Sequence, residues 1–276
     1  MNKKIYFLIF FITKLAYTEF LPGAKSISLG NIQSVLNKDL NAIFHNSAIL
    51  NEIDKKSIFL SYSPIYGIEN FYNAKIAVLY PFNNFKLSAG FYTIRLQNFY
   101  NYSKFLLSNA FQFKSFYFGL TLNYIFTSLS IENDEVKDVL SKKSAISFNI
   151  GILLKVNKNI TIGVSGKNLN NPNLSFKRNS ITKNDLREFR TGLRLNIFEN
   201  FRILGEEEFR KGEKPKTSIG SELVFYNVIY ARCGITDNLN LSTGFGAEFN
   251  LFEINFGILS NKELGNLWTI DFILKL

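Results

Sequence analysis

The sequence predicts an all-β protein: a transmembrane antiparallel β-barrel of about 14 strands with an N-terminal hatch segment. Three observations predict this fold. Most of the chain alternates apolar and polar residues with period two, as strands do when their two faces meet different surroundings. The connections alternate between short and long, and the last alternating segment runs to the C-terminus. After the first residues, no segment reaches the roughly 18 uninterrupted apolar residues that a spanning helix needs.

The N-terminus has the features of an export signal. Lys3 and Lys4 precede an apolar run over 5–12, and the small residues Ala16 and Thr18 follow it. The run is too short to cross a bilayer as a helix, although an uncleaved anchor is the alternative. The sequence therefore predicts a signal peptide at 1–18, a hatch segment at 19–56 and an outer-membrane barrel at 57–276.

Five segments show the alternation best, namely 116–126, 146–154, 189–197, 239–249 and 252–258. Weaker alternation predicts strands at 57–63, 73–80, 85–97, 105–113, 160–168, 201–209, 217–225 and 228–235. The phase slips near Phe91 and Tyr92, which predicts a bulge. The final segment, 267–276, places Trp268, Phe272 and Leu276 on its apolar face, where we expect them to meet lipid and to form the barrel-insertion signal.

The connections support the same topology. Short turns are expected at 83–84, 114–115, 157–159, 199–200, 226–227 and near Asn250, and longer loops at 64–72, 98–104, 131–144, 169–186, 210–216 and 261–266. The short connection 237–238 is the one exception to the alternation. Short periplasmic turns and long external loops are typical of outer-membrane barrels, and the parity places both ends of the barrel in the periplasm.

Composition limits the possible functions. The formal charge is +10, and removing the three lysines of residues 1–18 leaves +7. The basic residues are scattered among acidic ones, so we interpret them as lumen and loop charges and expect no nucleic-acid partner. Cys233 and His45 are the only residues of their types, which excludes an internal disulfide and disfavours a Cys/His zinc site or nucleophilic pair.

The polar faces of the later strands carry many charges of nearly balanced sign. The predicted lumen charges are Lys167, Glu188, Arg190, Arg194, Arg202, Glu206, Glu208, Glu222, Arg232, Glu248, Glu253 and Asp271. A charged constriction that selects a permeant is one interpretation. A salt-bridged interior that fills the barrel is the favoured one, because inward charges need partners wherever water is scarce. We expect no catalytic residue, cofactor or metal, since Glu207 points away from its two neighbours and no triad forms around His45.

The segment 20–51 does not follow the strand pattern, and its apolar residues have rough helical spacing. Within it, 23–30 (GAKSISLG) and 39–48 (DLNAIFHNSA) resemble the N-terminal signature of the PorV/PorQ family. Further on, 166–169 followed by Pro172 resembles a strand end of that family, and 232–234, 244–246 and the closing strand resemble its last hairpins. Ser47 stands where the family has proline in an Asn-Pro-Ala block.

The resemblance implies a function as well as a fold. The PorV/PorQ family is related to the FadL-type channels for fatty acids, and the relation implies a fourteen-stranded barrel with an inserted hatch, whose tight turn is at Asn46, Ser47 and Ala48. Some members receive exported cargo in the type IX secretion pathway. We therefore expect an outer-membrane protein that assists export or surface display of proteins. The alternatives are a FadL-like channel for hydrophobic or small solutes, or a structural barrel with no permeant. Expected partners are outer-membrane lipid, the barrel-assembly machinery, and either secretion-system components or a hydrophobic solute.

Overall fold

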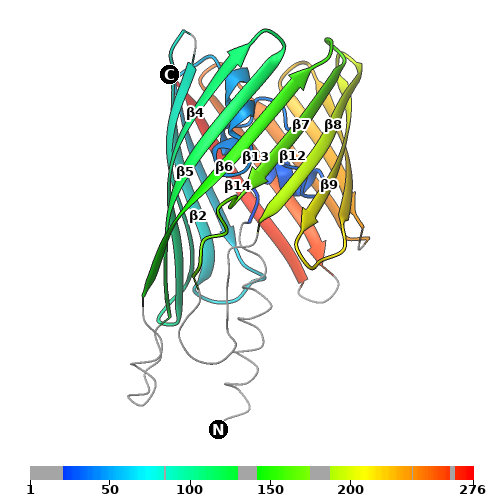
Figure 1. Cartoon of the computed structure of the whole chain (residues 1–276). Coiled ribbons are helices and arrows are strands. Elements are labelled where there is room, and N and C mark those ends of the chain that lie inside the picture. The colour runs from blue at the N-terminus through cyan, green and yellow to red at the C-terminus, as the bar shows by residue number, and fades with distance from the viewer. Residues whose placement is uncertain (1–20, 84, 130–141, 175–186, 238, 262–264) are drawn as a thin grey trace, which may run out of the picture.

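The described chain forms one closed barrel of fourteen antiparallel strands, which confirms the predicted fold class (Figure 1). The computed structural model describes residues 21–83, 85–129, 142–174, 187–237, 239–261 and 265–276. The expected signal peptide at 1–18 lies outside the described residues, as do most of the loops expected at 131–144 and 169–186 and the middle of the loop at 261–266.

Each strand pairs with its neighbours in sequence, and β1 closes the barrel on β14. The strands are β1 (Ser57–Pro64), β2 (Phe71–Pro81), β3 (Phe85–Leu96), β4 (Tyr100–Phe113), β5 (Phe116–Leu129), β6 (Lys143–Lys155), β7 (Ile160–Lys167), β8 (Glu188–Phe198), β9 (Phe201–Arg210), β10 (Lys216–Phe225), β11 (Ile229–Thr236), β12 (Leu241–Glu248), β13 (Phe252–Asn261) and β14 (Gly265–Lys275). Each predicted strand corresponds to one of these, with ends that differ by a few residues.

The bulge predicted near Phe91 and Tyr92 is wrong. Strand β3 pairs residue for residue with both β2 and β4. Phe91 points outward, where its ring lies 4.8 Å from that of Phe105, and Tyr92 points into the lumen. The apparent phase slip comes from an aromatic residue on the inward face, because the hatch makes part of the lumen apolar. The register shift lies instead between β8 and β9, at Asn196 and Phe198.

The outer surface of the barrel is apolar. Trp268, Phe272 and Leu276 lie outward and are 38%, 37% and 66% exposed, whereas Asp271 is inward and only 2% exposed. Large apolar side chains are exposed on the outer faces of the other strands as well. This is the arrangement expected of strands that face hydrocarbon on one side and a filled lumen on the other. Among the described residues, no helix has the length and apolar character needed to span a membrane.

The two ends of the barrel differ. Ser57 pairs with Lys275, so the first strand begins and the last strand ends at the same end, where the short turns also lie. We call this the short-turn end; it is at the top of Figure 1, beside the C-terminus. The longer connections lie at the opposite, long-loop end.

Residues 21–56, the described part of the hatch segment, lie inside the barrel (blue in Figure 1) and most are buried. The segment contains α2 (Ala24–Ser28) and two 3-10 helices, η1 (Leu40–Phe44) and η2 (Ser47–Glu52). The rough helical spacing of its apolar residues therefore corresponds to helix over only part of the segment. Because the wall surrounds the segment, its apolar residues need no common face. Leu29, Ile32, Val35 and Leu36 are all buried although none of them lies in a helix.

Candidate functional site: the hatch and its attachment to the barrel wall

The twelve predicted lumen charges all lie on the inward face of the barrel. Ten are buried, and Arg202 and Glu248 are partly exposed. Every carboxylate among them lies on β8–β14, which we call the ion-paired wall. Strands β1–β7 contain no Asp or Glu at all, and we call them the carboxylate-free wall. The two halves of the lumen therefore differ in charge chemistry.

Ion pairs connect ten of the twelve predicted lumen charges, in two groups. In the first, Arg190 bonds Glu188 and Glu206 at 2.6 Å each and also bonds Glu208, while Lys167 bonds Glu188 at 2.8 Å. The second group lies on β9–β14. There Glu222 pairs with both Arg202 and Arg232, and the ammonium of Lys275 bonds Glu248 and lies 3.8 Å from Glu253. This pairing is that of a filled interior, in which buried charges compensate one another.

Carboxylates of the ion-paired wall also hold the backbone of the hatch. One oxygen of Glu206 accepts the N–H groups of Gln33 and Ser34 at 2.9 and 2.5 Å. Asp271 accepts the N–H of Ala24 at 2.6 Å. These amides belong to backbone with few internal bonds of its own, and buried N–H groups must find an acceptor. The inward carboxylates thus serve the hatch as well as one another.

Side chains of the hatch extend this attachment. The carboxylate of Glu52, at the end of η2, lies 2.8 Å from Arg194 and 3.1 Å from Lys155. The ammonium of Lys25, in α2, lies 2.8 Å from Glu253. Sequence analysis did not find Lys25 and Glu52 as site residues, because their partners lie more than 100 residues away along the chain and are fixed only by the barrel register.

The predicted hatch turn at Asn46, Ser47 and Ala48 forms the start of η2. The side-chain oxygen of Asn46 accepts the N–H of Ala48 at 3.2 Å, and its amide donates to the carbonyl of Ser34 at 2.7 Å. The hydroxyl of Ser47 accepts a hydrogen bond from Thr121 on β5 at 3.1 Å. Asn46 is thus a helix N-cap that also joins two parts of the hatch. Ser47 thus makes a bond to the wall through its hydroxyl. The proline of the family pattern has no hydroxyl and could not make this bond.

Inward glycines let the hatch backbone touch the wall. They occur as cross-strand pairs: Gly119 with Gly151, Gly163 with Gly192, Gly220 with Gly234, and Gly244 with Gly257. We call these eight residues the glycine belt. A Cβ at Gly119 would lie 2.3 Å from the nitrogen of Ala48, and one at Gly163 would lie 2.2 Å from the carbonyl oxygen of Ser34. Side chains would therefore push the hatch off the wall.

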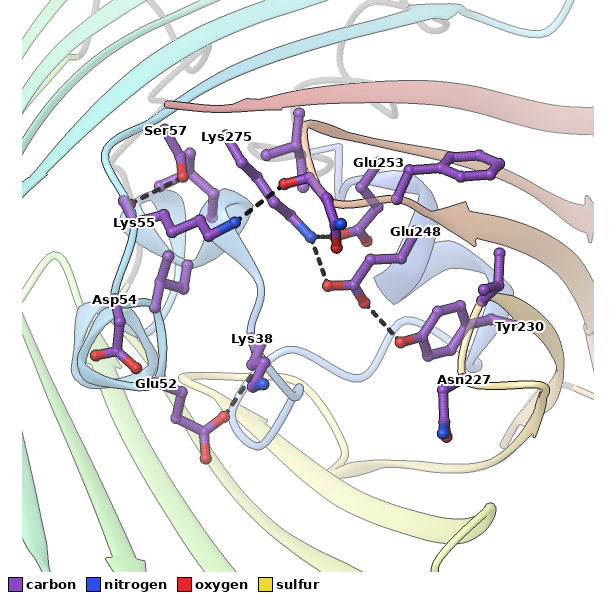
Figure 2. A pocket seen from close by; sticks show the side chains of 16 residues that line it. Lys38, Glu52, Asp54, Lys55, Ser57, Asn227, Tyr230, Glu248, Glu253 and Lys275 are labelled. Atoms are coloured by element: carbon purple, nitrogen blue, oxygen red, sulfur yellow. Dashed lines mark hydrogen bonds and ion pairs between the residues drawn. The ribbon is translucent and has the colours of Figure 1, made fainter.

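A cavity of about 690 Å³ opens at the short-turn end, between the hatch and the wall. We call it the vestibule (Figure 2). Its lining includes Lys38, Glu52, Tyr230, Glu248 and Lys275. Tyr230 donates to Glu248 at 2.6 Å, and Lys275 bonds the other oxygen of the same carboxylate. The vestibule is thus lined by both polar and apolar groups, and the carboxylates named here already have cationic or hydroxyl partners.

On the long-loop side of the hatch, a second cavity is far smaller. It measures about 20 Å³, close to the space of one water molecule, and its lining includes Phe44, Tyr92 and Leu106. Between this small cavity and the vestibule, apolar side chains fill the lumen, with the ring of Phe44 lying 6.4 Å from Phe59 and 6.2 Å from Tyr92. Phe44 therefore packs against the wall in the space between the two cavities.

His45 has a structural environment. It is buried, and its Nε2 lies 3.4 Å from a carboxylate oxygen of Asp39. Burial lowers the pKa of His45, and the hydrogen bond to Asp39 opposes this effect without overcoming it. Within the described parts of the chain, no group of three or more His, Cys, Asp or Glu residues is arranged to hold a metal ion.

Comparison with known proteins identifies the fold class. Neither a family model nor a curated protein sequence matches the chain. Among solved structures, the toluene transporter TodX of Pseudomonas putida matches with a TM-score of 0.72 and 10% identity, over 92% of this chain and 98% of that one. The toluene transporter TbuX of Ralstonia pickettii gives 0.69 and 12%, and a FadL homologue of Pseudomonas aeruginosa gives 0.65 and 9%, with the same coverage.

At such low identities, the likeness shows a shared fold. The chain has the barrel fold of the FadL-type hydrocarbon channels, which agrees with the FadL relation expected from sequence. Nothing in these comparisons supports the more specific PorV/PorQ resemblance.

Proposed function

We propose that this protein is an outer-membrane channel for a small hydrophobic solute, and that the hatch closes it in the state described here. The observation that carries the proposal is the hatch itself. A segment of the same chain lies within the lumen, bonded to most of the strands around it, in a barrel whose fold is shared with the toluene transporters TodX and TbuX. A purely structural barrel would need no inserted segment with a cavity on either side of it.

The interior is suited to an apolar solute on one side only. The inward residues Phe59, Tyr92, Tyr102, Leu106 and Ile125 belong to the carboxylate-free wall and are almost fully buried. Such a surface exchanges contacts with an apolar solute without breaking ion pairs. The apolar outer belt supports the proposed location in the outer membrane.

The export role implied by the PorV/PorQ resemblance is the second candidate. It rests on the motifs at 23–30 and 39–48, whereas the fold comparisons favour the channel, which sequence analysis held as an alternative. The two candidates predict different partners, namely a solute for the channel and protein components for export.

Uptake of an apolar dye tests the channel. N-phenyl-1-naphthylamine is excluded by an intact lipopolysaccharide leaflet and fluoresces when it reaches apolar surroundings inside. Gram-negative cells that make the protein should take up the dye faster than cells with an empty vector. The control is Phe272→Arg, which should reduce the amount of folded barrel. If uptake is unchanged while folded protein is present, and secretion components co-purify from detergent-solubilised membranes, the export role replaces the channel.

A further inference from the structure

The hatch is attached to the wall unevenly along its length. Its first part, 23–36, is bonded to the ion-paired wall through Asp271, Glu253 and Glu206. Its last part, η2, is bonded through Glu52 to Arg194 and Lys155 and through Ser47 to Thr121. These are bonds to charged or hydroxyl groups, and all partners except the partly exposed Lys155 are buried.

Between these two parts lies η1, whose contacts with the wall are of another kind. Ile43 and Phe44 lie against β3 near Gly90, and the ring of Phe44 packs against Phe59 and Tyr92. Lys75 adds a buried polar contact: its ammonium donates to Asn41 at 3.2 Å and lies 5.7 Å from the centre of the Phe44 ring. Apolar packing of this type is non-directional, so it tolerates sliding better than an ion pair does.

The position of η1 matters because it borders both cavities. Phe44 lines the small cavity on the long-loop side, and Leu40 lines the vestibule on the short-turn side. The five residues of η1 therefore separate the two spaces. They form a short 3-10 helix, as η2 does, so it is the apolar contacts with the wall and not the helix type that distinguish η1 from η2.

We propose that the hatch opens at η1 alone, and that the ring of Phe44 is the barrier on the route of the solute along β1–β3. Residues 23–36 and η2 stay attached to the wall while η1 moves. This inference rests on the proposed channel function where it says that a solute passes. The place at which the hatch moves does not depend on that function. It makes Phe44 a residue that determines which solutes pass, because the solute must take the place of its ring against Phe59 and Tyr92.

Hydrogen exchange of the full-length protein in lipid nanodiscs tests the location without any assumption about transport. The amides of Ala42 and His45 are bonded within and beside η1, whereas those of Ala24, Gln33 and Ser34 are bonded to the wall. All five are in the interior of the barrel. Ala42 and His45 should exchange at least about tenfold faster than the other three. Equal exchange, or faster exchange at Gln33 and Ser34, would overturn the proposal.

Dye uptake by variants tests the barrier. Phe44→Ala should raise the rate of N-phenyl-1-naphthylamine entry several-fold. The matched control is Leu29→Ala, which also shortens a buried apolar hatch residue but beside Gly220 and Gly234 of the ion-paired wall, and it should leave the rate unchanged. Gel mobility before and after heating verifies that both variants fold. An equal rise in both variants overturns the proposal. If the unaltered protein admits no dye, the channel function fails, and the exchange experiment still decides where the hatch loosens.

Discussion

The two walls of the lumen hold the same segment by different physical means. On the ion-paired wall, carboxylates are shared between cations of the barrel and amides of the hatch, as Glu206 is between Arg190 and the backbone of Gln33 and Ser34. On the carboxylate-free wall, η2 is still held by polar bonds to β5 and β6, but η1 is held on β1–β3 mainly by packing, as between Phe44 and Tyr92. Most of the hatch is therefore positioned by polar bonds, and η1 mainly by shape.

The difference has consequences for what each side permits. A buried charge that loses its partner is strongly unfavourable, so an ion-paired wall fixes the position of whatever it bonds. An apolar surface loses little when one apolar neighbour replaces another. A channel that opens without unfolding needs both properties, namely a fixed part that prevents loss of the hatch and a part that yields to a solute.

The largest effect is expected when most of the hatch is removed. Deleting 25–48 should leave a barrel that still inserts, because the strands pair only with one another. Its conductance in a planar bilayer should rise many-fold over that of the intact protein, which should be nearly closed to ions. An unchanged conductance would mean that the segment does not seal the lumen. A large conductance in the intact protein would instead favour a simple porin.

The next test compares the stability lost when one polar side chain is replaced on each wall. Arg190→Met should lower the free energy of unfolding by about 3–5 kcal/mol, because three buried carboxylates lose their shared cation. Ser108→Ala, on the carboxylate-free wall, removes a neutral 2.6 Å hydrogen bond to Thr121 and should cost about 0.5–1.5 kcal/mol. Urea unfolding followed by gel mobility measures both. Costs of equal size would show that the charges of the ion-paired wall carry no special weight.

Sequence alone predicted the barrel well, but it did not predict how the hatch is attached to the wall, for a physical reason. Alternation is a local property: a strand such as β5 records in its own residues which face meets lipid. The inward position of Asp271 and the outward position of Phe272 follow from the same local pattern. The strand count and the alternation of short and long connections were therefore readable before any contact was known.

The attachment of the hatch depends instead on register between distant residues. Nothing near Glu206 in sequence indicates that its carboxylate accepts two amides from Gln33 and Ser34. The glycine belt was visible only as small residues on a polar face, and its meaning appears when Gly163 is found against the carbonyl of Ser34. Helical spacing failed in the hatch because a segment enclosed on all sides has no exposed face to set the period.

A smaller effect is expected from charged substitutions at two adjacent residues of β14, one that faces outward and one that faces the lumen. Phe272→Arg should cost about 2–4 kcal/mol of barrel stability if residue 272 lies near the bilayer midplane, because it places a charge in lipid. The side chain of Asp271 faces the lumen, so Asp271→Arg places no charge in lipid. Its carboxylate lies against Gly23 and Ala24, however, where an arginine would meet the hatch. Asp271→Arg should displace the hatch and raise conductance while the barrel stays folded. A conductance unchanged from that of the unaltered protein would contradict this assignment.

The smallest effect is expected from Glu206→Gln, compared with the same change at Glu207. This pair tests most directly whether the ion-paired wall fixes the hatch. Glu206→Gln keeps the shape of the side chain but removes its charge, and Arg190 retains Glu188 and Glu208 as partners. The barrel should therefore stay stable. The amides of Gln33 and Ser34 should exchange about tenfold faster, because hydrogen bonds to a charged acceptor are stronger than those to a neutral one by about 1 kcal/mol or more.

Glu207→Gln is the matched control, since Glu207 is exposed on the outer face of β9 and should leave hatch exchange unchanged. If both variants loosen Gln33 and Ser34 alike, the effect comes from net charge. If Glu206→Gln loosens Ala42 and His45 to the same extent as Gln33 and Ser34, the hatch moves as one body. Residues 23–36 and η1 would then not differ in how firmly they are held, because loss of one bond between Glu206 and the hatch would also release η1.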